Sequence, residues 1–273
     1  MASQELSEHP TTKKPLWQAA MHLAKKLKPN FTHPYLNDSD WKTFDIACGP
    51  PLDLKWGSSI GDDFLRLVEL EKMQQIASQC EFDSEDWPEI DSEPEPYEQF
   101  SYAGSVAEHF DGYIKSVYLN KPLAEKLKWK FRTLLEGEEH LLRYTPGDAK
   151  WMIDQLASVK NSDLPHMSCI LREAHKLKED TLMFSEVWAV IILAILFLQN
   201  NSNSEYEVVP VTVLTLSGMT FRIVQGFVDC KEWRVKIRKS SVMAIGYEKE
   251  DFQSRAMLWL RWLLAEPILP GKH

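Results

Sequence analysis

The sequence V-W-A-V-I-I-L-A-I-L-F-L, from Val187 to Leu198, contains no polar side chain. A helix that is apolar on every face must be surrounded by protein or by lipid. These residues would rise about 18 Å as a helix, whereas the hydrocarbon layer of a membrane is about 30 Å thick. Extending the segment back to Leu182 would include Glu186, whose charge is costly inside a bilayer. The stretch therefore predicts the core helix of a globular domain, over about residues 181–199, rather than a membrane span.

The composition is that of a globular, acidic protein. Hydrophobic residues make up 44% of the 273 residues and aromatic residues 11%, which is typical of a chain with a packed core. Forty acidic residues against 31 basic ones give a formal net charge of -9. A negative field of this size repels phosphate backbones, so we expect no nucleic-acid partner.

The cysteines and the N-terminus indicate a reducing compartment. Cys48, Cys80, Cys169 and Cys230 are far apart in the sequence and form no close pair of metal ligands. The first residues, M-A-S-Q-E-L-S-E-H-P, lack the apolar run of a signal peptide. We therefore expect free thiols, no metal site, no cofactor and a cytoplasmic or nuclear location.

An acidic stretch divides the chain. Residues 81–98 hold nine acidic residues, three prolines and no lysine or arginine, so we expect an extended, solvated loop or linker. Before it, residues 1–14 are expected to be disordered and residues 15–80 to be a helical N-terminal region. After it, residues 99–273 are expected to form a helical bundle plus a sheet, in one globular unit with 15–80. The acidic loop is either a plain surface loop or a segment that captures a protein partner through Trp87, Ile90 and Tyr97.

Apolar residues at helical spacing predict a run of helices before the core helix. We expect them at residues 101–119 and from Pro122, Thr145 and Asp163 onward. In the helix from Asp163, His175 would lie on a solvent-facing surface. A metal site from Glu136, Glu139 and His140 is disfavoured because Gly137 interrupts the helix that would present them.

The C-terminal part reads as a small sheet. Residues 207–216, 221–228 and 233–238 are rich in β-branched or alternating apolar residues, and Ser217-Gly218 predicts a tight hairpin turn between the first two. A closing helix follows, with Trp259, Leu260 and Leu263 on its inner face. The predicted fold class is α+β: predominantly helical, with a small three-stranded antiparallel sheet near the C-terminus packed against the core helix and the closing helix.

This order of helix, three antiparallel strands and helix resembles the centre of the restriction-endonuclease-like nucleases. Their active strands carry an acidic residue and then a (D/E)-x-K motif. Asp229-Cys230-Lys231 fits the short motif, and Glu207 would be a distant second carboxylate for magnesium. The Pro-Asp pair that precedes the motif in these nucleases is missing. The resemblance therefore implies a degenerate form of the fold, with Asp229 and Lys231 as weak catalytic candidates.

Two further clusters are candidate binding sites. Arg234, Lys236 and Arg238 alternate with apolar residues, so they form a basic ladder. This partner-binding candidate meets nucleic acid, a phosphate or the acidic loop, or it only protects a strand edge. Trp188, Trp233, Trp259 and Trp262 converge near Glu186, Arg222 and Gln225 if the elements pack closely. That arrangement would be either an aromatic ligand pocket, with Glu186 as acid or base, or ordinary core packing.

The sequence contains neither a G-x-S-x-G motif nor a phosphate-binding glycine loop. We therefore expect a non-catalytic interaction or accessory protein, inside the cell, with a protein or a small molecule as its partner and without membrane contact. The alternative is an enzyme that acts on a small, largely apolar molecule in the aromatic pocket. A closed pocket near the tryptophans with a buried carboxylate or histidine would favour the enzyme.

Overall fold

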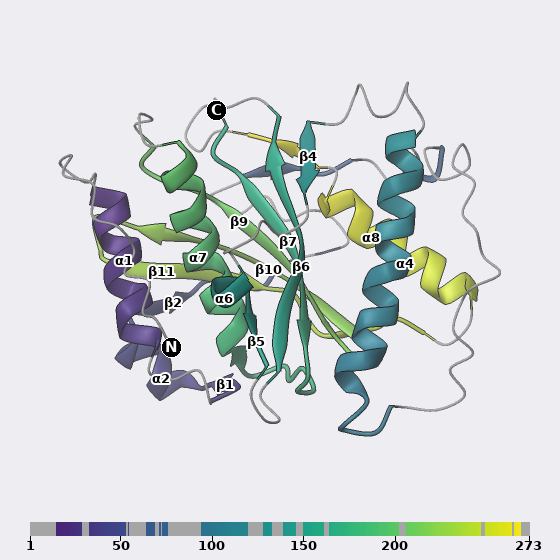
Figure 1. The fold of residues 1–273 in the computed structure, drawn as a ribbon, viewed down its shortest axis with the longest axis horizontal. Helices are drawn as coiled ribbons and strands as arrows, with labels where there is room; N and C mark the ends of the chain where they lie inside the picture. Colours follow the sequence, from purple (N-terminus) through teal and green to yellow (C-terminus); the bar gives the residue numbers. More distant parts are fainter. Residues whose placement is uncertain are drawn as a thin grey trace.

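The computed structural model has three layers, with one mixed β-sheet between two pairs of helices (Figure 1). Helices α1 (Pro15–Leu27) and α7 (Phe184–Asn200) cover one face of the sheet, and α4 (Gln99–Leu119) and α8 (Lys249–Leu263) cover the other. The structure describes residues 15–28, 33–52, 54, 64–68, 71, 73–75, 94–119, 128–132, 139–145, 150–160, 164–201, 206–246, 249–263 and 265–268.

The central strands of the sheet lie in the order β2-β11-β10-β9-β7-β6-β4. Their bounds are β2 (Ile46–Cys48), β11 (Arg234–Lys239), β10 (Thr220–Asp229), β9 (Val211–Ser217), β7 (Met167–Glu173), β6 (Trp151–Val159) and β4 (Trp129–Arg132). Two short strands join the sheet, β5 (Arg143–Tyr144) on β6 and β12 (Met243–Ala244) on β10. Neighbours are antiparallel except for β7 with β9 and β11 with β2, which are parallel. The connection from β7 to β9 runs through α7, as a parallel pair requires.

Four short strands and two short helices complete the described chain. Strand β1 (Tyr35–Leu36) pairs with β8 (Leu182–Met183), and β3 (Leu65–Arg66) pairs with β13 (Glu266–Pro267). Helix α2 (Asp38–Thr43) begins with a capping box, in which Asn37 accepts hydrogen bonds from backbone N–H groups of the first turn. Helix α6 (Glu139–Leu142) lies directly before β5.

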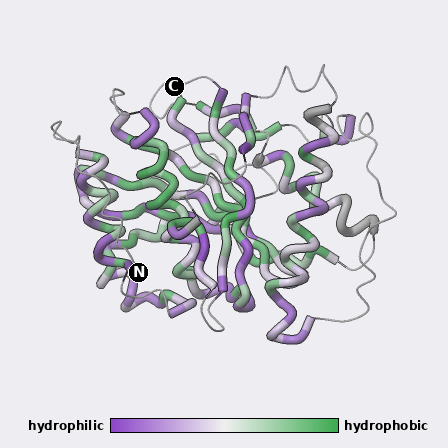
Figure 2. Tube along the Cα trace, in the orientation of Figure 1, coloured by the Kyte–Doolittle hydropathy of each residue, from purple (hydrophilic) through white to green (hydrophobic). Residues whose placement is uncertain are grey.

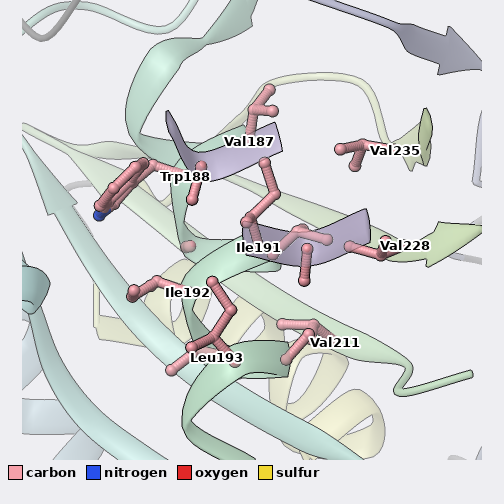
Figure 3. Close-up of a cluster of buried hydrophobic side chains, with 14 of the residues drawn as sticks. Val187, Trp188, Ile191, Ile192, Leu193, Val211, Val228 and Val235 are labelled. Carbon is pink, nitrogen blue, oxygen red and sulfur yellow. The ribbon is translucent and has the colours of Figure 1, made fainter. Parts of the chain in front are cut away.

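The predicted core helix is confirmed. All residues of α7 from Phe184 to Leu198 are buried, because the sheet covers one side of the helix and α1 covers another. Figure 3 shows its side chains in one cluster with Val211, Val228 and Val235 of the strands. Figure 2 shows the same helix as a continuous hydrophobic segment. Across the part of the chain that the structure describes, no helix is both long enough and apolar enough to span a membrane.

The predominantly helical fold class with a small three-stranded sheet is wrong. The predicted strands are present as β9, β10 and β11, and the hairpin turn at Gly218 has the positive φ of 53° that glycine tolerates. They belong, however, to a nine-stranded mixed sheet among the described residues. Three of its other strands, β4, β6 and β7, come from segments that we expected to be helices.

The helices predicted from Thr145 and from Asp163 are strands β6 and β7. The described part of the segment predicted as a helix from Pro122 contains strand β4. In β6, a bulge between Ile153 and Gln155 shifts the register, so Ile153 and Leu156 both point into the core although they are three residues apart. A bulge thus gives a strand the spacing of a helix. Strand β7 is buried on both faces, so it has no period-two pattern. The helix predicted at 101–119 is confirmed as α4.

Candidate functional site

A cleft of about 1080 Å³ lies where β7 ends. Its walls come from four places in the sequence: β1, the segment that leads into α4, the residue before β6 and the residues after β7. The side chains that matter below are Tyr35, Tyr97, Phe100, Lys150, His175 and Lys176. Trp151 is paired with Glu173 across β6 and β7, so strand pairing brings Lys150 next to the end of β7.

A buried carboxylate holds the histidine of this cleft. Glu173 is only 1% exposed, and its Oε1 lies 3.2 Å from His175 Nδ1 and accepts a hydrogen bond from the His175 backbone N–H. Its Oε2 accepts a hydrogen bond of 2.6 Å from the hydroxyl of Ser185, in the first turn of α7. Because Nδ1 is committed to Glu173, the ring nitrogen that remains for a ligand is Nε2.

The surroundings of Glu173 influence its protonation and that of its neighbours. Burial raises the pKa of Glu173, and the hydrogen bonds from His175 and Ser185 act in the opposite direction. Burial also raises the pKa of Tyr35, with a further contribution from the nearby charge of Glu173. Tyr35 donates a hydrogen bond to the carbonyl of Lys176, and its ring lies under the Lys178 ammonium at 3.8 Å.

The segment Pro94–Glu98 forms a fixed wall of the cleft. Glu98 N donates to Glu95 O at 2.8 Å, which closes a β-turn with Pro96 and Tyr97 in its centre. Gln99 donates from its side chain to the Pro94 carbonyl, and its own carbonyl accepts from Gly218 N. The turn is therefore attached to the β9–β10 hairpin, and the Tyr97 side chain remains 82% exposed.

The carboxylate that the sequence singled out, Glu186, lies in a second and fully closed site. Glu186 and Arg222 are both 0% exposed. Arg222 donates through Nε and Nη2 to the two oxygens of Glu186, at 2.7 and 2.5 Å. Thr215 Oγ1 and the Met183 backbone N–H donate to the same carboxylate, and Arg222 Nη1 donates to two carbonyls, of Lys178 and Thr181. Glu186 caps α7 and anchors it to β10, and it does not line the cleft at the end of β7.

The tryptophans do not form the aromatic pocket that we considered. Trp188 lies in the core on the α1 and α7 face of the sheet, and its Nε1 donates to the carbonyl of Leu141. Trp259 and Trp262 lie in the core on the opposite face. Trp233 is 42% exposed in the β10–β11 turn, with a φ of 54°. Gln225 is buried in β10 at a small cleft beside Phe227, away from these rings. The sheet therefore lies between Trp188 and the pair Trp259 and Trp262, which we had expected to converge.

The nuclease-like motif at Asp229-Cys230-Lys231 is a turn. Asp229 accepts hydrogen bonds from the backbone N–H groups of Lys231 and Glu232, and it pairs with Lys236 at 2.8 Å. Although burial acts to raise it, these hydrogen bonds lower the pKa of Asp229. Lys231 and Glu207 are about 80% exposed and 3.8 Å apart. Turn formation accounts for the spacing of Asp229 and Lys231.

The basic ladder of β11 is paired largely within the chain. Arg234 and Lys236 each form an ion pair with Glu232, at 3.3 Å in both cases. Arg238 donates to the carbonyl of Pro50. Of the proposed partner-binding residues in the acidic loop, Trp87 and Ile90 lie outside the described residues, as does Glu136 of the disfavoured metal site. Tyr97 lines the cleft at the end of β7.

Sequence reasoning missed most of the cleft. His175 was expected on a solvent-facing helix surface, but it lies just after β7 and is half-buried against Glu173. Glu173, Ser185, Lys150 and Lys176 were not considered. The available signal was the polar sequence R-E-A-H-K directly after the run M-S-C-I-L, which is typical of a strand end that carries functional groups.

A third polar group lies on the other face of the same strands. Asp154 and Arg172 form an ion pair under α4, where Phe100 packs against the Arg172 guanidinium at 4.9 Å. Gly104 leaves room for this guanidinium, since a Cβ there would lie 2.5 Å from Arg172 Nη1. Burial raises the pKa of Asp154, and Arg172 acts to lower it. No three His, Cys, Asp or Glu side chains among the described residues lie close enough together to hold a metal ion.

Comparison with known proteins assigns no family. No protein-family model matches the chain, and no curated protein is significantly similar to it in sequence.

Proposed function

We propose that this chain is a non-catalytic accessory protein that binds a small, phosphate-bearing molecule in the cleft at the end of β7. The single observation that carries the proposal is the composition of the cleft. Among the described residues, Lys150, His175 and Lys176 line it against one acidic residue, Glu95, in a chain whose formal net charge is -9. A locally positive concave surface on a negative protein attracts small anions.

The residues around the cleft suit a phosphate. Lysine binds phosphate as a point charge, and an imidazole fixed by a carboxylate adds a directed hydrogen bond. Glu173 orients His175 from the buried side of the imidazole. Because Glu173 is only 1% exposed, its own charge does not face the ligand. A volume of about 1080 Å³ accommodates a ligand larger than inorganic phosphate.

The element order supports a degenerate restriction-endonuclease-like core, although not where the sequence suggested it. Helix α4, antiparallel strands β4, β6 and β7, and helix α7 repeat the order of helix, three strands and helix, with α6, β5 and the two-residue strand β8 inserted. Asp154 lies on the second strand, and Glu173-Ala174-His175 occupies the place of (D/E)-x-K with histidine instead of lysine.

The geometry of these carboxylates favours binding over hydrolysis. Arg172 and Glu173 are neighbours in a strand, so their side chains lie on opposite faces of the sheet. Asp154 pairs with Arg172, whereas Glu173 binds Ser185 of α7. The two carboxylates are therefore separated by the sheet and each is held by internal partners, which is unsuited to a shared magnesium ion.

Calorimetric titration with inorganic phosphate and with ribose 5-phosphate, at constant ionic strength, tests the proposal. We expect saturable binding to the wild type and a loss of affinity of about tenfold or more in K150A/K176A, because two charge contacts are removed. The matched control is K25A/K231A, which makes the same change in net charge at exposed lysines outside the cleft. Absent binding, or equal loss in the control, would refute the site.

A nuclease assay tests the non-catalytic part separately. The protein is incubated with single-stranded and duplex DNA and RNA in the presence of magnesium or manganese. We expect no cleavage above that of a Glu173→Gln variant. Cleavage that is present in the wild type and lost in E173Q would show that the core is an active nuclease.

A further inference from the structure

We infer that the ligand of the cleft carries its phosphate on an aromatic ring system, and that this ring stacks on Tyr97. The inference rests on the proposed function, since it concerns the other end of the same ligand. Tyr97 and Trp233 are the two large hydrophobic side chains that the structure shows as exposed in its described part. Tyr97 is the one that lines the cleft.

The backbone that carries Tyr97 is held in place, and the Tyr97 ring is in solvent. Tyr97 follows Pro96 in the turn that the hydrogen bond between Glu98 N and Glu95 O closes at 2.8 Å, and Pro96 restricts the backbone there. Buried Pro94 and the hydrogen bonds of Gln99 attach this turn to the hairpin at Gly218. An aromatic side chain on a fixed turn is preorganised for stacking and loses little conformational freedom on binding.

The other aromatic rings of the cleft indicate what Tyr97 binds. Phe100 packs against the guanidinium of Arg172, and Tyr35 packs against the ammonium of Lys178, so each already has a cation of the protein on its ring. Tyr97 remains 82% exposed. A cationic ligand is disfavoured because Lys150 and Lys176 line the same cleft. A planar aromatic group is therefore the ligand chemistry that fits the Tyr97 ring, with the phosphate toward the lysines and His175.

A pair of ligands that differ only in the aromatic part tests the inference. The probes are AMP and ribose 5-phosphate, which share the ribose and the phosphate. Stacking of one base on one aromatic side chain is worth roughly 1–3 kcal/mol, so we expect AMP to bind about tenfold more tightly than ribose 5-phosphate. In Tyr97→Leu this ratio should fall to about one while ribose 5-phosphate binding is unchanged.

Trp233→Leu is the matched control, because it removes the other exposed aromatic ring at a position outside the cleft. It should keep the AMP preference of the wild type. Equal binding of both probes to the wild type, or an AMP preference that survives in Y97L, would overturn the aromatic inference and leave the phosphate site standing. If neither probe binds, the proposed function fails instead. A single-stranded oligonucleotide that binds far more tightly than AMP would overturn the assignment of a small molecule.

Discussion

Two buried carboxylates lie at the two ends of the connection from β7 to α7, and the fold uses them differently. Glu186 faces Arg222, whose charge is permanent, and four donors surround its two oxygens in a site without solvent. Glu173 faces the imidazole of His175, which lines a cleft, and Glu173 lies directly behind that cleft. Both are buried, so burial alone does not distinguish a structural carboxylate from one at a site.

The difference lies in the partner. The Arg222 guanidinium is 0% exposed and makes four hydrogen bonds inside the protein, so a ligand cannot reach it. The Glu186–Arg222 pair therefore fastens α7 to β10. An imidazole that spends one nitrogen on a carboxylate keeps the other for a ligand. We therefore expect substitutions in the Glu186–Arg222 pair to lower stability most. Substitutions in the Glu173–His175 pair should change ligand binding more than stability.

The largest effect is expected from Glu186→Gln. This substitution leaves Arg222 buried without its counter-charge, and breaking a buried ion pair costs about 3–5 kcal/mol. Urea unfolding followed by tryptophan fluorescence measures the loss. The double variant E186L/R222M should recover part of it, since two apolar groups replace two charges. The comparison variant is E266Q, which breaks the exposed ion pair between Arg66 and Glu266. If E186Q lost less stability than E266Q, the structural role of Glu186 would be contradicted.

A smaller effect on stability is expected from the protonation of the buried His166. His166 is 1% exposed, and burial lowers its pKa to about 4 from an ordinary 6.5, although backbone groups of Phe64 and Ile268 act against this shift. Between these two pKa values the unfolded chain binds more protons than the folded one, so stability increases with pH up to about 6.5. The contribution is fully present above that pH and is lost as the pH falls toward 4.

We expect His166 to reduce the free energy of unfolding by about 2 kcal/mol between pH 7.5 and pH 5. His166→Gln keeps a side-chain amide that can bond to the Phe64 carbonyl but does not titrate in this range. Its stability should therefore depend less steeply on pH over the same interval. Identical slopes for the wild type and H166Q would show that His166 does not contribute.

The same contrast explains how much could be predicted from the sequence. Residues 187–198 were identified as a core helix because an apolar run of this length exceeds a strand and is too short for a membrane. Strands β9 to β11 were identified from β-branched residues and the glycine turn. Strands β6 and β7 were mistaken for helices because the bulge at Asp154 and burial on both faces removed the period of two.

Of the two carboxylates, only Glu186 was found in advance, because a single acidic residue in an apolar helix is visible in the sequence alone. Glu173 becomes significant only through pairing. The register of β6 with β7 brings Lys150 to it, and the start of α7 brings Ser185. A site made of such long-range contacts requires the sheet order, which local patterns do not contain.

The hydroxyl groups that bind the two carboxylates allow the most direct comparison of the two sites. Ser185 donates to Glu173 and Thr215 donates to Glu186, at 2.6 and 2.8 Å. In Thr215→Val, the oxygen that loses a donor still accepts from Arg222 Nε, so we expect a loss of stability of at most about 1 kcal/mol. In Ser185→Ala, Glu173 Oε2 loses the hydroxyl donor beside it, and about 1–3 kcal/mol is expected.

The binding readout separates the two variants further. The hydrogen bond from Ser185 acts to lower the pKa of Glu173 against burial, so S185A raises that pKa further and weakens the acceptor that orients His175. We therefore expect S185A to lower the affinity for ribose 5-phosphate and T215V to leave it unchanged, when both are titrated under conditions where they are fully folded. If T215V lowers the affinity as much as S185A does, the two carboxylates act as one network and the division into a structural pair and a site pair is wrong.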